Sequence, residues 1–131
     1  MIPDPQFRKP SDAERALLNR LLEADFPGKE ELGALLRLVL VKTIDEDGGL
    51  ELQSQIGGKA HVVKRVPVEA EGKDEDGVVI HMLLHVVDGR PVELEFFRND
   101  GGTVRKTPCP AAFEVIVLSP IPKYGWKSPA K

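Results

Sequence analysis

Hydrophobic and polar residues alternate along residues 78–98, on both sides of the pair Asp88-Gly89. Strong β-formers flanking an Asp-Gly pair predict a β-hairpin at the centre of a sheet. A two-residue loop would place Leu84 opposite Glu93, so we expect a three-residue loop, which keeps the apolar residues together. One face of the hairpin then collects Ile80, Met82, Leu84, Val86, Val92, Leu94 and Phe96.

Two amphipathic helices are expected ahead of the sheet. Ser11 and Glu14 have the spacing of a capping box, which predicts a first helix from residue 12 to about residue 25. Its leucines recur at helical spacing and form one apolar stripe. A second, shorter helix begins at Lys29. The three prolines of residues 1–10 predict an extended lead-in.

Further strands follow from period-two alternation and from Asp-Gly turns. Residues 38–44 and 50–53 are expected to form a first hairpin, residues 61–70 a third strand, and residues 113–118 a last strand. The third strand should pair with the fourth through Ala70 and Val78, Val68 and Ile80, and Val66 and Met82. Pro67 cannot donate to a ladder, so we expect an edge or a bulge there.

The elements together predict an α+β fold, with two N-terminal helices packed on one face of a five- or six-stranded antiparallel meander sheet. The chain has 131 residues, 41% of them hydrophobic, which suits one domain, expected over residues 1–118. Prolines and lysines dominate residues 119–131, which we expect to be a mobile tail.

Charge and cysteine content narrow the possible partners and location. The net charge is -3 and the basic residues are scattered, which argues against nucleic acid or a membrane as a partner. Cys109 is the only cysteine, so no intrachain disulfide can form. The N-terminus lacks the apolar run of a secretory signal, and we expect a cytoplasmic protein.

Candidate chemistry gathers on the other face of the central hairpin. The candidate binding face comprises Arg65, His81, Leu83, His85, Glu93, Glu95 and Phe97. His81 and His85 lie about 13 Å apart at ~3.3 Å per residue, so they cannot share one metal ion. A histidine beside Glu93 or Glu95 is an acid-base candidate, although a cross-strand ion pair explains the same residues. We therefore expect no metal, no cofactor and no catalytic residue.

Other motifs have plainer interpretations. The segments around Asp45 and Asp74 lack the later oxygen ligands of a calcium loop, so they are interpreted as turns. Cys109 lies between two prolines with no histidine nearby in sequence, which indicates a loop thiol or a half-buried thiol rather than a nucleophile.

Several segments resemble, as a set, a bacterial family of small one-domain α+β proteins whose function is unknown. They are residues 14–18 (ERALL), 25–28 (DFPG), 43–45 (TID), 66–70 (VPVEA), 76–77 (DG), 83–89 (LLHVVDG) and 93–95 (ELE). The resemblance covers residues 11–118. It implies a bacterial protein with this order of elements, and it assigns no site residues.

Three functions remain open on this basis. The first is a non-catalytic protein-binding domain, immunity-like or regulatory, which needs a complementary surface and no reactive group. The second is a small-ligand-binding protein or enzyme that uses the polar face of the sheet. The third is self-association through that face, as in a homodimer. A deep pocket would favour the second function, and a flat face the first.

Overall fold

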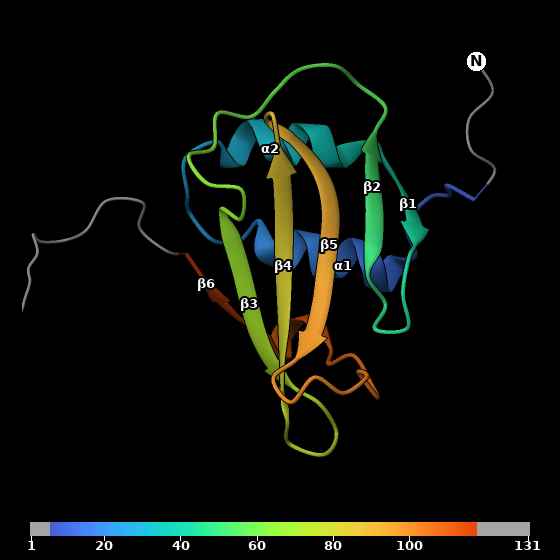
Figure 1. Ribbon diagram of the computed structural model, residues 1–131. Helices are drawn as coiled ribbons and strands as arrows, with labels where there is room; N and C mark the ends of the chain where they lie inside the picture. The colour runs from blue at the N-terminus through green and yellow to red at the C-terminus, as the bar shows by residue number, and fades with distance from the viewer. Residues whose placement is uncertain (1–5, 118–131) are drawn as a thin grey trace, which may run out of the picture.

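The computed structural model describes residues 6–117, in which two helices lie behind a six-stranded sheet (Figure 1). The helices are α1 (Asp12–Leu21) and α2 (Lys29–Arg37). The strands are β1 (Val39–Thr43), β2 (Leu50–Ser54), β3 (Val68–Lys73), β4 (Val79–Val87), β5 (Arg90–Arg98) and β6 (Glu114–Ile116). A single 3-10 turn, η1 (Pro110–Ala112), precedes β6. The predicted α+β fold is confirmed, while the expected tail at residues 119–131 lies outside the described residues.

The sheet is antiparallel throughout, in the order β1-β2-β5-β4-β3-β6. Strands β3, β4 and β5 follow one another as adjacent strands, β2 borders β5, and β6 borders β3 (Figure 1). The lead-in also joins the sheet, because Arg8 exchanges two backbone hydrogen bonds with Val41 on the outer side of β1. No helix among residues 6–117 is long and apolar enough to cross a membrane.

Helix α1 begins where its capping box predicts. The Ser11 hydroxyl accepts from the Glu14 amide at 3.1 Å, and the Glu14 carboxylate accepts from the Ser11 amide at 2.8 Å. The expected end near residue 25 is wrong, since the helix ends at Leu21. Beyond that point the amides of Glu23 and Ala24 donate three residues back, which tightens the chain into a turn.

The central hairpin has a two-residue loop, so the expected three-residue loop is wrong. Asp88 and Gly89 both have positive φ, 52° and 76°, as a type I′ turn requires. Pairing then shifts between His85 and Val86, and Val92 is left without a partner as a bulge. The bulge restores the predicted pairing of Leu84 with Leu94, while Pro91 replaces Val92 in the buried face.

Strand β3 starts seven residues later than expected and pairs with β4 in a different register. Ala70 lies opposite Met82 rather than Val78, because the connecting turn closes tightly between Asp74 and Val78. Pro67, which has no amide hydrogen, directly precedes the strand instead of lying within it. The shift is an even number of residues, so the same side chains still face the helices.

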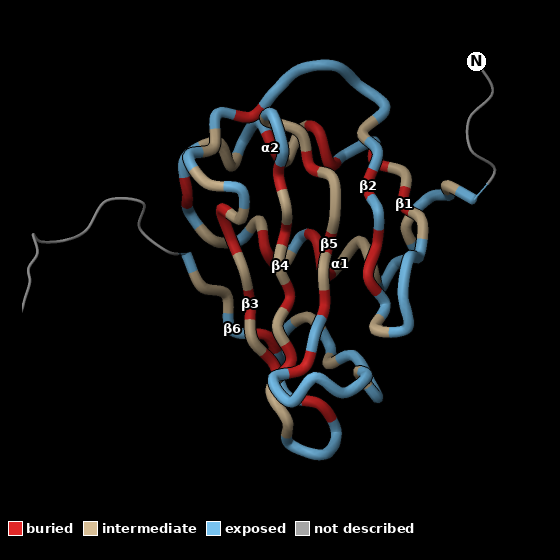
Figure 2. The backbone as a smooth tube through the Cα atoms, viewed as in Figure 1, coloured by how far each residue is buried: buried red, intermediate tan, exposed pale blue. Residues whose placement is uncertain are grey.

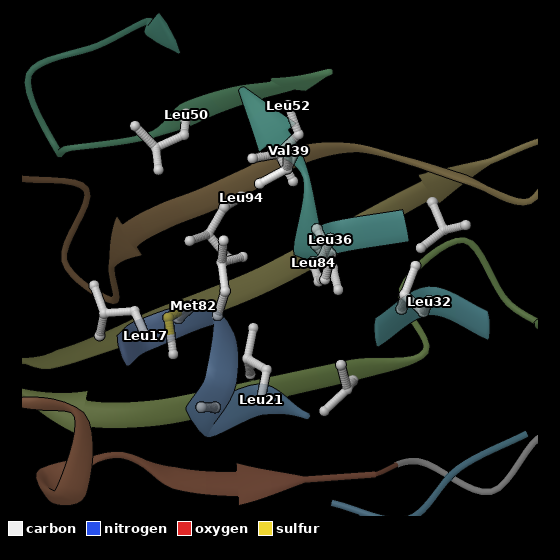
Figure 3. Close-up of a cluster of buried hydrophobic side chains, with 14 of the residues drawn as sticks. Leu17, Leu21, Leu32, Leu36, Val39, Leu50, Leu52, Met82, Leu84 and Leu94 are labelled. Atoms are coloured by element: carbon white, nitrogen blue, oxygen red, sulfur yellow. The ribbon is translucent and has the colours of Figure 1, made fainter. Parts of the chain in front are cut away.

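The core fills the space between the helices and the sheet (Figure 3). Leucines of both helices meet the even-numbered residues of β4 and β5, as the alternation predicted. The labelled core residues in Figure 3 are Leu17, Leu21, Leu32, Leu36, Val39, Leu50, Leu52, Met82, Leu84 and Leu94. The helices thus cover one face of the sheet and leave the other face without a helix over it.

Candidate interaction face

The face of the sheet turned away from α1 and α2, called the open face below, lies toward the viewer in Figures 1 and 2. Along β4 its residues are half-buried and alternate with fully buried ones (Figure 2). Cross-strand registers place on it Lys42, Glu51, Gln53, Glu69, Glu71, Lys73, His81, Leu83, His85, Glu93, Glu95, Phe97 and Glu114.

Six of the seven candidate binding residues lie on the open face, and Arg65 reaches it from the loop before β3. Three direct cross-strand pairs link β4 and β5 there. They are His81 with Phe97, Leu83 with Glu95, and His85 with Glu93. The pattern of strand alternation therefore placed the β4 and β5 residues correctly, since side chains two apart share a face.

His85 is held between two charged side chains. Arg65 Nε donates to His85 Nδ1 at 3.1 Å, so the ring is hydrogen-bonded as the tautomer with its proton on Nε2. That Nε2–H points to Glu95 Oε1 at 2.7 Å. Only 14% of the His85 side chain is exposed, and both ring nitrogens are hydrogen-bonded. His85 therefore holds Arg65 and Glu95 in fixed positions on the open face.

His81 is also engaged, and it carries the aromatic part of the open face. Its ring stacks on Phe97, with ring centroids 4.7 Å apart and an angle of 18° between the planes. Its Nε2 contacts Asn99 Oδ1, and its Nδ1 lies 3.6 Å from Glu71 Oε2. Phe97 remains 38% exposed, so one side of this stack is open to solvent.

His61 lies apart from the other two histidines. It follows β2 in a loop rather than in a strand, and its ring and amide both contact the carboxylate of Glu31 on α2 at 2.9 Å. These contacts lower the pKa of Glu31. Within residues 6–117, no three histidine, cysteine or acidic side chains are grouped so as to hold a metal ion.

The sequence reasoning missed the extent of the negative charge on this face. Six glutamates lie there, and they come from β2, β3, β5 and β6: Glu51, Glu69, Glu71, Glu93, Glu95 and Glu114. The basic side chains beside them are Lys42, Lys73 and Arg65. Period-two glutamates in VEAEG and ELEFF were the available signal, and only those of β5 were singled out.

Two pairs of these glutamates lie directly opposite one another. Glu51 of β2 faces Glu93 of β5, and Glu71 of β3 faces Glu114 of β6. Like charges in directly opposed positions destabilise a sheet. Lys42 Nζ lies 3.7 Å from Glu51 and offsets part of the first repulsion. His81 Nδ1 lies 3.6 Å from Glu71 in the second pair. The open face therefore keeps two pairs of like charges in opposed positions.

A hollow of about 340 Å³ opens beside the second glutamate pair. It is lined by Glu71, Gly72, Lys73, Val79, Ala112 and Glu114. On the helix side of β3, Gly72 leaves room for Phe113, because a Cβ there would lie 3.1 Å from the ring of Phe113. The hollow combines two carboxylates with an aliphatic wall, and its lining does not include His85, Glu93 or Glu95.

A second cavity, of about 440 Å³, lies on the helix side of the sheet. Its floor is formed by core residues Leu17, Leu50 and Phe96, and the segment 107–110 forms one wall. Cys109 in that wall lies in a loop, one of the two predicted states, and its thiol is free and exposed rather than half-buried. This cavity contains none of the candidate binding residues.

A buried ionic cluster secures the end of the sheet. The side chain of Arg98 is 5% exposed and donates to Asp74 at 2.9 Å, Asp76 at 2.9 Å and Asp100 at 2.7 Å. Asp74 also accepts from the amides of Glu75, Arg105 and Lys106. The sequence pattern identifies the aspartates only as turn residues. Strand alternation places Arg98 on the core side of β5, and there it reaches all three of them.

These contacts shift the pKa values of the cluster. Burial of Asp74 acts to raise its pKa, but hydrogen bonds from Arg105, Glu75, Arg98 and Lys106 outweigh burial and lower it to about 2. Hydrogen bonds from Arg98 likewise hold the pKa of Asp100 below its usual range. The same bonds raise the pKa of Arg98. The pKa of Asp76 is lowered by Arg98 as well. Arg98 and the three aspartates are therefore charged near neutral pH.

A family model described as a domain of unknown function (DUF6984) matches residues 7–108. The chain belongs to this family. The matched part of this DUF6984 protein runs from the lead-in through β5 and the Arg98 cluster, while η1 and β6 lie beyond it. No curated protein and no solved structure matches the chain.

Proposed function

We propose that this DUF6984 protein is a non-catalytic protein-binding domain that contacts its partner through the open face. The observation that supports this proposal is the position of Leu83 and of the His81–Phe97 stack among charged side chains. Protein interfaces combine apolar and aromatic anchors at the centre with a polar rim. A domain of this kind acts by covering part of its partner, as immunity and regulatory proteins do.

The contacts of the histidines favour binding over catalysis. A general base needs a ring nitrogen within reach of a substrate proton. Both nitrogens of His85 already face Arg65 and Glu95, and His81 faces Asn99 and Glu71. The alternative function, binding or conversion of a small ligand on the open face, would need these contacts to break first.

Self-association through the open face is also less favourable. Two copies meeting there would bring together two faces that each carry six glutamates and only three basic side chains, so both would have a net negative charge. The cost of like charges across an interface reaches several kcal/mol. A partner with a different surface is therefore the better fit, and light scattering of the purified protein distinguishes the two cases.

The test is a comparison of Leu83→Asp with the matched variant Leu38→Asp in affinity purification from native host cells. Leu38 is 52% exposed and joins α2 to β1, so its change adds the same charge outside the candidate binding face. We expect Leu83→Asp to reduce recovery of the partner by about tenfold or more, as for an anchor worth ~2 kcal/mol. Leu38→Asp should recover it as the wild type does.

Circular dichroism and thermal melting establish that both variants are folded. A folded Leu83→Asp protein that retains the same host proteins, in the same amounts as the wild type, would contradict the proposal. In that case the functional surface lies elsewhere on the domain.

A further inference from the structure

The open face is unusual in leaving glutamates opposite glutamates. A sheet that only needed a solvated outer face would gain stability from a lysine or threonine at one position of each pair. Here Glu51 faces Glu93, and Glu71 faces Glu114. Such an arrangement lowers the stability of the isolated protein, and it becomes favourable when cations are placed between the carboxylates.

The centre of the face carries two apolar side chains, Leu83 and Phe97, which a simple ion would leave without a partner. Leu83 lies between Glu69 and Glu95 on the neighbouring strands, and Phe97 has an exposed side beside His81. A protein segment that alternates basic and apolar side chains would satisfy both the carboxylates and these two anchors. Exposed aromatic faces also attract guanidinium and ammonium groups.

The hollow beside β6 has a size and lining that suit one long basic side chain. Its volume is about 340 Å³, the carboxylates of Glu71 and Glu114 border it, and Val79 and Ala112 provide an aliphatic wall. Lysine and arginine place a charged end beyond an apolar stem, and a mixed wall of this kind accommodates both parts. Lys73 at the border of the hollow and His81, 3.6 Å from Glu71, are the side chains that an incoming basic group would compete with.

We propose that the partner presents a basic segment to the open face, with a lysine or arginine side chain in the hollow between Glu71 and Glu114. This inference rests on the proposed function and adds the chemistry of the partner to it. Complementary charge speeds association and selects the partner, while the apolar anchors slow its release. Binding should weaken as salt is added, because these glutamates lie at the surface.

The test uses two synthetic peptides of equal length and with identical apolar residues. The charged positions are lysine and arginine in one peptide and glutamate in the other. NMR titration of the labelled protein is expected to shift amide signals of β3, β4 and β6 with the basic peptide alone. The shifts should diminish at higher salt.

The double variant Glu71→Gln/Glu114→Gln removes the charge of the hollow and keeps its shape. It should bind the basic peptide roughly three- to tenfold more weakly than the wild type. The control Glu30→Gln/Glu46→Gln removes two exposed glutamates from α2 and from the β1–β2 turn, and it should bind as the wild type does. Circular dichroism and thermal melting should show both variants folded at the temperature of the titration.

The outcomes separate this inference from the proposed function. No shift with the basic peptide, equal binding of both peptides, or unchanged binding by the Glu71/Glu114 variant overturns the basic-partner inference. If Leu83→Asp still abolishes capture of the host partner, the binding function stands and only the partner chemistry is wrong. If Leu83→Asp also has no effect, both are wrong.

Discussion

Leu83 and Leu84 are identical in type and adjacent in sequence, yet they belong to different parts of the molecule. Leu84 is completely buried among the helix leucines, while Leu83 is half-buried on the open face. Strand alternation alone separates them, because successive side chains of a strand point to opposite faces. Whether a residue of β4 has an even or an odd number therefore decides whether its side chain packs in the core or lies on the open face.

Replacing Leu84 by Ala should lower the free energy of unfolding by ~2–5 kcal/mol, through lost burial and the cavity left behind. Urea denaturation measures this cost. Leu38→Ala is the matched control, because that side chain is 52% exposed and should change stability by less than about 0.5 kcal/mol. Equal losses for the two variants would show that Leu84 does not lie at the centre of the core.

The elements begin and end where local chemistry and tertiary contacts agree. Helix α1 starts at a capping box that Arg8 extends, since the Arg8 guanidinium donates to both oxygens of Glu14 at 2.7 and 2.9 Å. This contact lowers the pKa of Glu14. Because Arg8 also pairs with Val41, the N-terminus of α1 is tied to the edge strand β1.

Replacing Ser11 by Ala should destabilise the protein by ~1 kcal/mol, because the Glu14 amide loses its acceptor. Thermal melting and hydrogen exchange of the first-turn amides measure the effect. Ser11→Asp, which keeps an acceptor at the N-cap, should restore most of the stability. Equal stability of Ser11→Ala and the wild type would show that the cap contributes little to α1.

The Arg98 cluster links two parts of the molecule that are distant in sequence, the β3–β4 turn and the segment after β5. Asp74 has a pKa of about 2 when folded, compared with an ordinary value of 3.8. A depressed pKa contributes stability that is fully present above the ordinary value and is lost as the pH falls toward the folded one. Acid should therefore weaken this end of the sheet between about pH 4 and pH 2.

The test compares the wild type with Asp74→Asn by urea denaturation from pH 7 to pH 2. The variant should be less stable at pH 7, since it cannot carry the charge that Arg98 and the three amides stabilise. The difference should then diminish below about pH 4, where Asp74 of the unfolded wild type begins to bind a proton, and become small near pH 2, where the folded protein binds it too. A difference that stays constant down to pH 2 would contradict the assigned role of this carboxylate.

Much of the fold could be predicted because its patterns are local. The capping box located the start of α1, and the leucine stripes and the alternation of β4 and β5 identified most of the buried side chains, with Val92 of β5 the exception. The loop of the central hairpin was mispredicted because Asp88-Gly89 favoured two residues while the apolar pattern favoured three, and a bulge at Val92 satisfied both. A bulge changes which residues pair across the strands without changing the alternation along the sequence. Periodicity alone therefore could not predict the bulge at Val92.

Period and parity along the chain are enough to assign most core-facing residues, the antiparallel class of the sheet and the β4 and β5 residues of the candidate face, because neighbouring residues define them. Strand order is not local in this way. β2 borders β5 and β6 borders β3 because of how the whole domain packs. These neighbours, distant along the chain, set the two glutamate pairs and the hollow beside Glu114. Alternation, in contrast, follows from the geometry of a single strand, so it could be predicted without them.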